Sequence, residues 1–344
     1  MHIPDGYLSL QTTIPVLAGM VPVWAVAFRK VKKTLSSKRI PALALCAAFS
    51  FLIMMFNVPV AGGSSGHAVG AVFIAILLGP WAATISVSMA LLIQALVFGD
   101  GGIISFGINC LNMAVVMPFT GYYLYKLIAG KSKLGSSRNL VGTFIGSYVG
   151  LNIAAIFAGF ELGIQPLLFK AANGTPLYSP YPLSVSIPSM ALAHTVFAGP
   201  LEGIVTTAAI AYIIKFAPQL FGQNQPILAE EPAGLFFKKY KAILISLAVL
   251  VVLTPIGLLA TGTAWGEWGT DEIKDKLGYI PKGFAAMADK WHALIPDYSL
   301  PALGVSRVGT SLGYILSAVV GIVLISGLII LTSKLILRAQ KGNK

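Results

Sequence analysis

Apolar residues in this chain gather in long runs, unlike the amphipathic or alternating patterns of a soluble domain. The longer runs approach or exceed the roughly 20 residues that an α-helix needs to cross a bilayer. They predict an all-α, polytopic integral membrane protein of nine transmembrane helices, with spans at residues 12–28, 41–56, 68–79, 81–98, 105–128, 139–163, 186–214, 242–262 and 308–332. Gly79-Pro80-Trp81 separates the third span from the fourth, and we interpret it as a tight turn between two short spans.

Composition agrees with a membrane protein. Hydrophobic residues make up 56% of the 344 residues and charged residues 10%, against about 25% charged in a typical soluble domain. The mean hydropathy is +0.82. The two cysteines, Cys46 and Cys110, lie singly in apolar spans, and we interpret them as packing residues.

The distribution of basic residues predicts the orientation. Of the 24 Lys and Arg residues, 18 fall on alternate connections, at 29–39, 126–138, 215–241 and 334–344. By the positive-inside rule the C-terminus is cytoplasmic and the N-terminus lies outside the cytoplasmic membrane of a prokaryote. The net charge of +12 therefore reflects topology and gives no reason to expect a nucleic-acid partner.

The first two residues, Met1 and His2, form a compact metal chelator. We expect no removable signal peptide before the first span, so the amine of Met1 is free. This amine, the backbone nitrogen of His2 and the Nδ1 of its imidazole can close two adjacent chelate rings around one cation. Three nitrogens in one plane suit Ni(II) or Cu(II) and are poor for Mg²⁺ or Ca²⁺. The competing interpretation is a flexible chain start without function.

A fourth nitrogen should come from another histidine on the outside face. His67 follows a connection, residues 57–66, that is rich in glycine and small residues and that the topology puts outside. In the same connection, Asn57 and Ser65 are candidate polar partners around the ligands.

The other two histidines have a weaker claim to the metal. His194 lies inside a span, about 80° around the helix from Glu202, where a functional role and a structural hydrogen-bonded pair are equally consistent with the sequence. His292 falls in the polar loop 263–307 and is expected to be solvated.

The opening Met-His-Ile-Pro-Asp-Gly-Tyr-Leu-Ser resembles the N-terminus of the CbiM/NikM family. The resemblance covers roughly residues 1–215 and continues through short motifs at residues 54–59, 66–67, 78–82, 94–96, 98–102, 109–112 and 202–203. Members are substrate-capture (S) components of energy-coupling-factor (ECF) transporters for cobalt and nickel. In that family the terminal amine, the backbone and imidazole nitrogens of the second residue, and a later histidine hold the metal in a square plane. The resemblance assigns these roles to Met1, His2 and His67.

Two observations favour nickel as the transported substrate. The Ile-Pro-Asp-Gly opening resembles the nickel branch, whereas cobalt members more often read Ile-Met-Glu-Gly. Ni(II) also has a higher intrinsic affinity than Co(II) and suits the square plane. We therefore expect Ni(II) to be captured outside and carried inward, with Co(II) for cobalamin biosynthesis as the alternative.

The sequence divides into two predicted modules: a metal-capture module at 1–216 and, after a proline-bearing cytoplasmic linker at 217–241, a hairpin of two spans at 242–344. The hairpin with its outside loop resembles the small auxiliary component of the CbiN/NikN type. It departs from related domains at residues 296–300, which read Pro-Asp-Tyr-Ser-Leu in place of Pro-Asp-Gly-Leu-Glu. An ordinary membrane anchor is the alternative. All expected metal ligands lie in the first module, and none is expected from the hairpin.

The chain is not expected to be an enzyme. It contains no Walker A motif, so it should bind no ATP through a P-loop. The resemblance implies two kinds of partner in or at the lipid bilayer: a transmembrane coupling subunit (CbiQ/NikQ-like) and two cytoplasmic ATP-binding-cassette ATPases (CbiO/NikO-like). Gly142, Gly146 and Gly150 suit a close helix contact, either within the protein or with the coupling subunit.

Two other classes of membrane protein are alternatives to a substrate-capture component. A membrane metalloenzyme would need His67, His194 and Glu202 at one depth, which the predicted topology opposes, and no His-Glu-x-x-His motif supports it. A proton-coupled secondary transporter would use carboxylates in mid-membrane. Only Glu161 and Glu202 approach that description, and no inverted repeat is visible.

Overall fold

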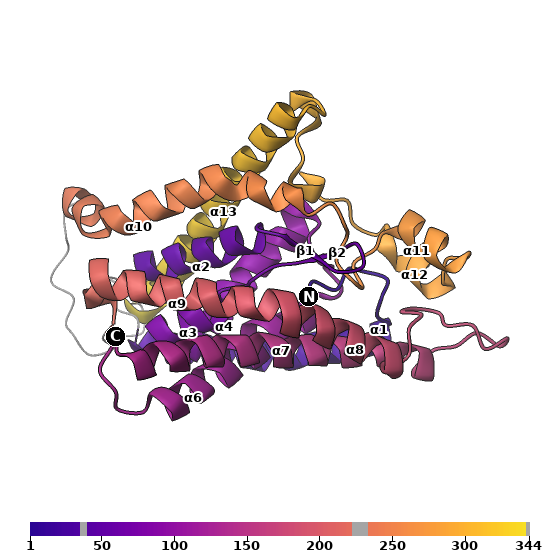
Figure 1. The fold of residues 1–344 in the computed structure, drawn as a ribbon, viewed down its shortest axis with the longest axis horizontal. Coiled ribbons are helices and arrows are strands. Elements are labelled where there is room, and N and C mark those ends of the chain that lie inside the picture. The colour runs from indigo at the N-terminus through magenta and orange to yellow at the C-terminus, as the bar shows by residue number, and fades with distance from the viewer. Residues whose placement is uncertain (35–39, 222–232, 342–344) are drawn as a thin grey trace.

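The computed structural model describes residues 1–34, 40–221 and 233–341 of the chain. It is a bundle of helices with one short two-stranded sheet (Figure 1). Six helical stretches among the described residues are long and apolar enough to cross a membrane, at Leu10–Lys32, Pro80–Phe98, Ser137–Leu168, Leu183–Phe216, Tyr240–Leu259 and Arg307–Thr332. The prediction of an all-α, polytopic membrane protein is thus confirmed, while the number of crossings and the orientation stay predictions.

The first two thirds of the chain supply most of the bundle. Its helices are α1 (Leu10–Thr34), α2 (Ile40–Met54), α3 (Ala71–Leu78), α4 (Pro80–Ile93), α5 (Phe106–Cys110), α6 (Met117–Ala129), α7 (Ser137–Leu168), α8 (Leu183–Ala193) and α9 (Gly199–Phe216). The chain breaks at Gly79, where φ is 95°, and Pro80 opens the next helix, as predicted. The eight residues of α3 extend only about 12 Å. This helix is therefore too short to cross a bilayer by itself.

Three of the predicted spans contain a π-helical turn. These turns, η2 (Gln94–Phe98), η3 (Leu111–Val116) and η4 (His194–Ala198), continue α4, join α5 to α6 and join α8 to α9. Such turns are rare and frequently accompany functional sites. Gln94 and His194 each begin one of them, and both turns lie close to the site described below.

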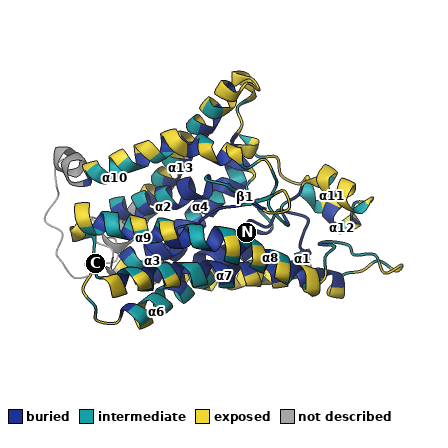
Figure 2. Ribbon diagram, viewed as in Figure 1, coloured by how far each residue is buried: buried dark blue, intermediate teal, exposed yellow. Residues whose placement is uncertain are grey.

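Burial follows the arrangement expected for a protein solvated by lipid. Buried positions concentrate in α2, α3 and α4, whereas the outer helices carry many exposed positions (Figure 2). Many of the residues at these exposed positions are apolar. Leu192, Ile204 and Val323, for example, are 62%, 60% and 63% exposed, which hydrocarbon tolerates because it is as apolar as these side chains. Cys46 and Cys110 are buried free thiols, so their interpretation as packing residues is confirmed.

The glycine stripe on α7 is used inside the protein. A Cβ added at Gly146 would lie 2.6 Å from the carbonyl oxygen of Gly121 on α6, and one at Gly150 would lie 2.7 Å from that of Met117. At Gly142 the backbone nitrogen of Ala129 would be 3.2 Å away. The absence of side chains therefore allows α6 and α7 to pack backbone against backbone. Of the two uses that the sequence left open, the structure selects the contact within the chain.

The last third forms a helical hairpin with a structured loop. Its elements are α10 (Ala233–Leu253), η6 (Thr254–Leu259), α11 (Thr270–Leu277), α12 (Lys282–Ala288), η7 (Pro296–Tyr298), η8 (Pro301–Leu303) and α13 (Arg307–Lys341). The polar loop 263–307 thus contains two short helices that the sequence analysis did not predict. α13 packs against α2 and α4, and the hydroxyl of Tyr314 donates to the carbonyl oxygen of Met55 at 2.9 Å.

Part of the predicted linker can be placed. Pro218–Leu220 form the short turn η5, and α10 begins at Ala233. Residues 222–232 of the linker lie outside the described residues, as do the basic residues Lys38, Arg39 and Lys344 used to predict the orientation.

Candidate metal centre

The N-terminal segment is buried inside the molecule. The exposed fractions of Met1, His2 and Ile3 are 6%, 1% and 2%. Asn109 holds the segment in place, because its Oδ1 accepts from the backbone N–H of Ile3 at 2.8 Å and its Nδ2 donates to the carbonyl oxygen of Ile3 at 3.1 Å. A flexible chain start is therefore not what the structure contains.

Asp5 ties the same segment to the start of α5. Its carboxylate accepts backbone hydrogen bonds from Ile103, Ile104 and Ser105 at 2.9–3.0 Å. Backbone N–H groups at the start of a helix have no partner within the helix and therefore bind an anionic group well. Gly102 is needed here, since a Cβ at that position would overlap Asp5.

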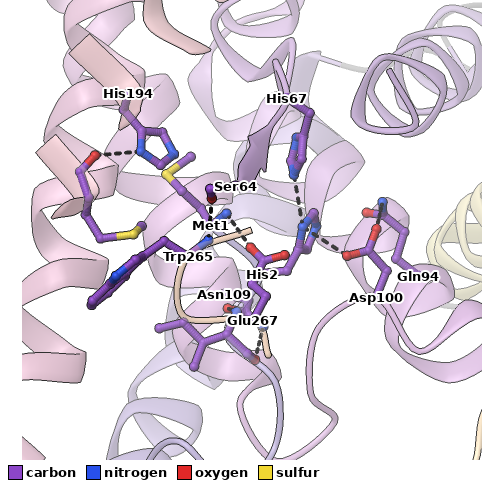
Figure 3. Close-up of polar contacts among 12 residues, drawn as sticks. Met1, His2, Ser64, His67, Gln94, Asp100, Asn109, His194, Trp265 and Glu267 are labelled. Carbon is purple, nitrogen blue, oxygen red and sulfur yellow. Dashed lines mark hydrogen bonds and ion pairs between the residues drawn. The ribbon is translucent and has the colours of Figure 1, made fainter. Parts of the chain in front are cut away.

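The imidazole rings of His2 and His67 lie next to each other, with centroids 5.0 Å apart and ring planes inclined by 34°. Nδ1 of His2 and Nε2 of His67 are 3.2 Å apart, and Figure 3 shows the His67 ring pointing at the His2 ring. For a metal–nitrogen bond of about 2.0 Å, neighbouring corners of a square lie about 2.8 Å apart. The observed separation is close to this value, so both nitrogens can reach one metal ion with a small adjustment.

The hydrogen bonds of His67 fix which of its nitrogens is free. Its Nδ1 lies 3.0 Å from the carbonyl oxygen of Ala68, and a carbonyl can only accept, so Nδ1 carries the proton. Nε2 then has a lone pair directed at His2, the usual arrangement of a metal-binding histidine. Burial lowers the pKa of His2 to about 4 and that of His67 to about 4. Both imidazoles are therefore neutral, as coordination requires, at physiological pH.

A small sheet and a buried carboxylate position His67. β1 (Val58–Val60) and β2 (Ser64–Gly66) pair antiparallel, and Gly62 and Gly63 form their turn with φ of 85° and 74°. On the other side of His67, Oε2 of Glu202 accepts from the backbone N–H groups of Val69 and Gly70 at 2.7 and 3.0 Å. The segment carrying His67 is thus held at both ends.

Two further carboxylates contact the donor nitrogens. Oε1 of Glu267 lies 2.8 Å from the amine of Met1, and Oδ1 of Asp100 lies 3.1 Å from Nδ1 of His2 (Figure 3). The other oxygen of Asp100 accepts from the hydroxyl of Tyr298 at 2.6 Å and from Nε2 of Gln94 at 3.1 Å. Glu267 and Tyr298 belong to the C-terminal loop, so this loop reaches the centre of the site.

The candidate residues of the first module therefore come together. Met1, His2 and His67 are adjacent, and Asn57 and Ser65 line a cavity of about 340 Å³ beside them. Residues 257–258 and 260–264 of the C-terminal module also line this cavity. The solvated position expected for His292 is confirmed by its exposure.

The suggestion that His194 and Glu202 form a hydrogen-bonded pair is wrong. Nδ1 of His194 pairs with the carbonyl oxygen of Met190 at 2.7 Å, whereas Glu202 binds Thr206 and the segment after His67. The π-helical turn at 194–198 lies between the two residues and breaks the regular angular step on which the comparison of their faces depended. Figure 3 places His194 near the side chain of Met1.

Asp100, Glu267 and Tyr298 are not among the residues predicted for the site. Asp100 lies in a Gly-Asp-Gly-Gly motif, which was a usable signal, because glycines around a single acid permit close approach of the backbone. Glu267 and Tyr298 had no such signal, since their partners are about 200 residues or more away in the sequence.

Comparison with known proteins gives the family. Residues 2–220 match the model of the cobalt uptake substrate-specific transmembrane region, CbiM. The chain belongs to the CbiM family. Residues 239–338 match the PDGLE domain, so the CbiM chain carries a second recognisable region over the hairpin and its loop.

The relatives of this CbiM chain are transport proteins. It is 45% identical over 340 residues to the fused nickel transport protein NikMN of Rhodobacter capsulatus, covering 94% of this chain and 95% of that one. It is 42% identical over 334 residues to the Probable fused nickel transport protein LarMN of Lactiplantibacillus plantarum, with 94% and 95% covered. The crystal structure of a truncated transition metal transporter matches at 51% identity and a TM-score of 0.59, covering 62% of this chain and 99% of that chain.

These matches, together with the membrane-spanning helices, establish the general role. The chain is a multi-pass membrane protein of a prokaryotic cell membrane and a component of nickel or cobalt transport. It is a transport protein and not an enzyme, which excludes the membrane metalloenzyme.

Proposed function

We propose that this chain is the substrate-capture component of an ECF importer and binds Ni(II) outside in a square plane of four nitrogens. The donors are the amine of Met1, the backbone nitrogen and Nδ1 of His2, and Nε2 of His67. The observation that carries the proposal is the 3.2 Å approach of the two imidazole nitrogens beside the buried chain start. Chain connectivity places the other two donors next to Nδ1 of His2, so His67 completes the set.

The donor set favours Ni(II) over Co(II) as the substrate. Deprotonated nitrogens in a plane suit the geometry of Ni(II), which also stands above Co(II) in intrinsic affinity. Two relatives that match along almost the whole of this chain are named as nickel transport proteins. Co(II) in the same site is the alternative.

The energy for inward delivery comes from other subunits in this proposal. The family resemblance implies a membrane coupling subunit of the CbiQ/NikQ type and two ATPases of the CbiO/NikO type. A proton-coupled mechanism is less well supported, because both intramembrane carboxylates have structural partners: Glu161 binds Asn112 and Glu202 binds the segment after His67. Metal uptake in cells that lack the ATPases would favour the proton-coupled alternative.

The decisive experiment compares the native chain start with an extended one. Purified protein with a free Met1 amine, verified by mass spectrometry, is titrated with Ni(II) and Co(II) and its absorption spectrum recorded. Bound Ni(II) should give the yellow d–d band of a square-planar nitrogen site. A fixed extension of two residues before Met1 should abolish tight binding and the band while the protein still inserts and folds.

A cleavable leader supplies the matched control. Its removal regenerates the native amine and should restore both the affinity and the band. Tight binding by a verified extended protein would contradict the amine as a ligand. A higher affinity for Co(II) than for Ni(II) would instead favour the cobalt alternative.

A further inference from the structure

The amine of Met1 has its polar contact in the other module. Oε1 of Glu267 lies 2.8 Å from the amine nitrogen, and the two residues are 266 positions apart in the sequence. Glu267 is fixed in the loop between η6 and α11 and is 19% exposed at its side chain. This ion pair joins the C-terminal module directly to an atom that the proposed function makes a metal ligand.

Both flanks of Glu267 are anchored to the segments that carry the ligands. The backbone N–H of Trp265 donates to Oγ of Ser64 at 2.9 Å, in the sheet that leads to His67. The hydroxyl of Tyr7 donates to the carbonyl oxygen of Trp268 at 3.0 Å, in the segment that begins with Met1. The position of the Glu267 carboxylate is thus set by the same elements that set the two ligand segments.

Coordination chemistry distinguishes Glu267 from Asp100. A metal-bound primary amine keeps two N–H groups, so a carboxylate at this distance can accept from the amine both before and after the metal binds. Nδ1 of His2 has no proton left once it coordinates, so its 3.1 Å contact with Asp100 cannot persist as a hydrogen bond. Glu267 is therefore the acidic contact that is compatible with the loaded site.

We propose that Glu267 is a positioning residue for the amine ligand: the C-terminal module holds the amine in the ligand plane and keeps accepting from it after the metal binds. The inference rests on the proposed function, because it assumes that the amine coordinates. A partner of this kind orients a ligand and raises its donor strength, and removing one typically weakens metal affinity about 10- to 100-fold.

The test uses full-length protein and Ni(II) as the only metal. The variant Glu267→Gln keeps the size of the side chain and removes its charge. Asp275→Asn is the matched control, because it removes one negative charge from an exposed position on α11 in the same loop. Two quantities are measured: the Ni(II) affinity with its d–d band, and, without metal, the rate at which an amine-selective acylating reagent modifies Met1, followed by mass spectrometry.

For Glu267→Gln we expect faster acylation of Met1, an affinity for Ni(II) reduced about tenfold, and a d–d band at longer wavelength because the amine becomes a weaker donor. Asp275→Asn should match the wild type in all three. Glu267→Asp retains the charge but withdraws it by one methylene, and it should give an intermediate affinity. If the Gln variant does not fold, this Asp variant carries the test.

Two results would overturn the inference. Unchanged acylation in the Gln variant would mean that the ion pair does not hold the amine. Faster acylation with wild-type affinity and band would mean that Glu267 anchors the chain start without serving the metal. Failure of the proposed function would give a different result. In that case the N-terminally extended protein would still bind Ni(II) tightly, whatever residue stands at position 267.

Discussion

Oε2 of Glu202 accepts a hydrogen bond from the backbone N–H of Val69 at 2.7 Å, two residues after His67. Glu202 is fully buried, and its other oxygen accepts from the hydroxyl of Thr206 at 3.0 Å. A buried carboxylate thus satisfies the free N–H groups that precede α3 and fixes the direction in which the chain leaves His67. This acid, in the middle of a predicted span, serves the site by positioning a ligand segment.

Replacing Glu202 should therefore lower the stability of the protein and its affinity for Ni(II), although Glu202 is not itself a predicted ligand. In Glu202→Gln, the carboxamide oxygen can still accept from Val69 and Gly70 and its NH2 can donate to the hydroxyl of Thr206, but these bonds lose the help of the carboxylate charge, which costs about 1 kcal/mol of stability. The Ni(II) affinity should fall with it, as His67 becomes less well placed. Thermal unfolding and Ni(II) titration measure the two effects. Glu161→Gln, whose carboxylate binds Asn112, is the control and should leave the affinity closer to that of the wild type.

His67→Ala and His292→Ala should differ sharply. Losing one of four in-plane nitrogens leaves water at that corner and should lower the Ni(II) affinity by orders of magnitude, with loss of the four-nitrogen band. His292 is exposed in the loop, so its replacement should be close to silent. Isothermal titration or competition with a chelator measures both. Equal effects would mean that the site has been mislocated.

Tyr298→Phe tests the contact between the C-terminal loop and Asp100. Tyr298 has a φ of 57°, which is strained for a residue other than glycine. Its ring stacks on that of Phe98, with the ring centroids 4.6 Å apart. Phenylalanine keeps the ring but removes the 2.6 Å hydrogen bond to Asp100. A hydrogen bond to a charged group is worth about 1.5–3 kcal/mol, and the loss should appear in thermal unfolding. Tyr279→Phe, at an exposed position, should have no such effect.

The glycine contact between α6 and α7 predicts opposite results at two helix positions. Gly146→Ala places a methyl group 2.6 Å from a carbonyl oxygen and should destabilise the protein by about 1–3 kcal/mol. Gly327→Ala, on α13, meets nothing within 4 Å and should be neutral or stabilising by up to about 1 kcal/mol. The difference between the two unfolding midpoints is the measurement. Similar midpoints would show that the helices can separate without cost.

Truncation after residue 216 should weaken metal binding without abolishing it. The truncated chain keeps Met1, His2 and His67 but loses Glu267, so the Ni(II) affinity should fall about tenfold, as in Glu267→Gln. The solved truncated relative covers a similar share of this chain, 62%. Titration of the truncated protein, alongside uptake with the coupling subunit and ATPases, tests the division of labour. Complete loss of binding would mean that the hairpin supplies a ligand.

Much of the fold and part of the candidate site could be predicted from local sequence. Long apolar runs predict membrane helices because hydrocarbon requires every backbone hydrogen bond to be satisfied within the segment. The break at Gly79-Pro80 could also be predicted locally, because glycine readily ends one helix and proline is favoured at the first position of the next. Met1 and His2 could be predicted as chelators because covalent connectivity alone sets the spacing of their three nitrogens.

The predicted topology and the family resemblance already pointed to His67, but only the tertiary structure decided how closely it approaches His2 and which distant carboxylates meet these donors. The approach of His67 to His2 at 3.2 Å, the ion pair of Glu267 with Met1 and the support of the His67 segment by Glu202 all join residues far apart in the chain. Such contacts depend on how whole helices and loops pack, and a single acidic residue has the same local appearance whether it is solvated or aimed at a ligand. The sequence by itself therefore determined the membrane class and the chelating start. The packing of residues that lie 65 to 266 positions apart in the sequence determined which groups surround this chain start.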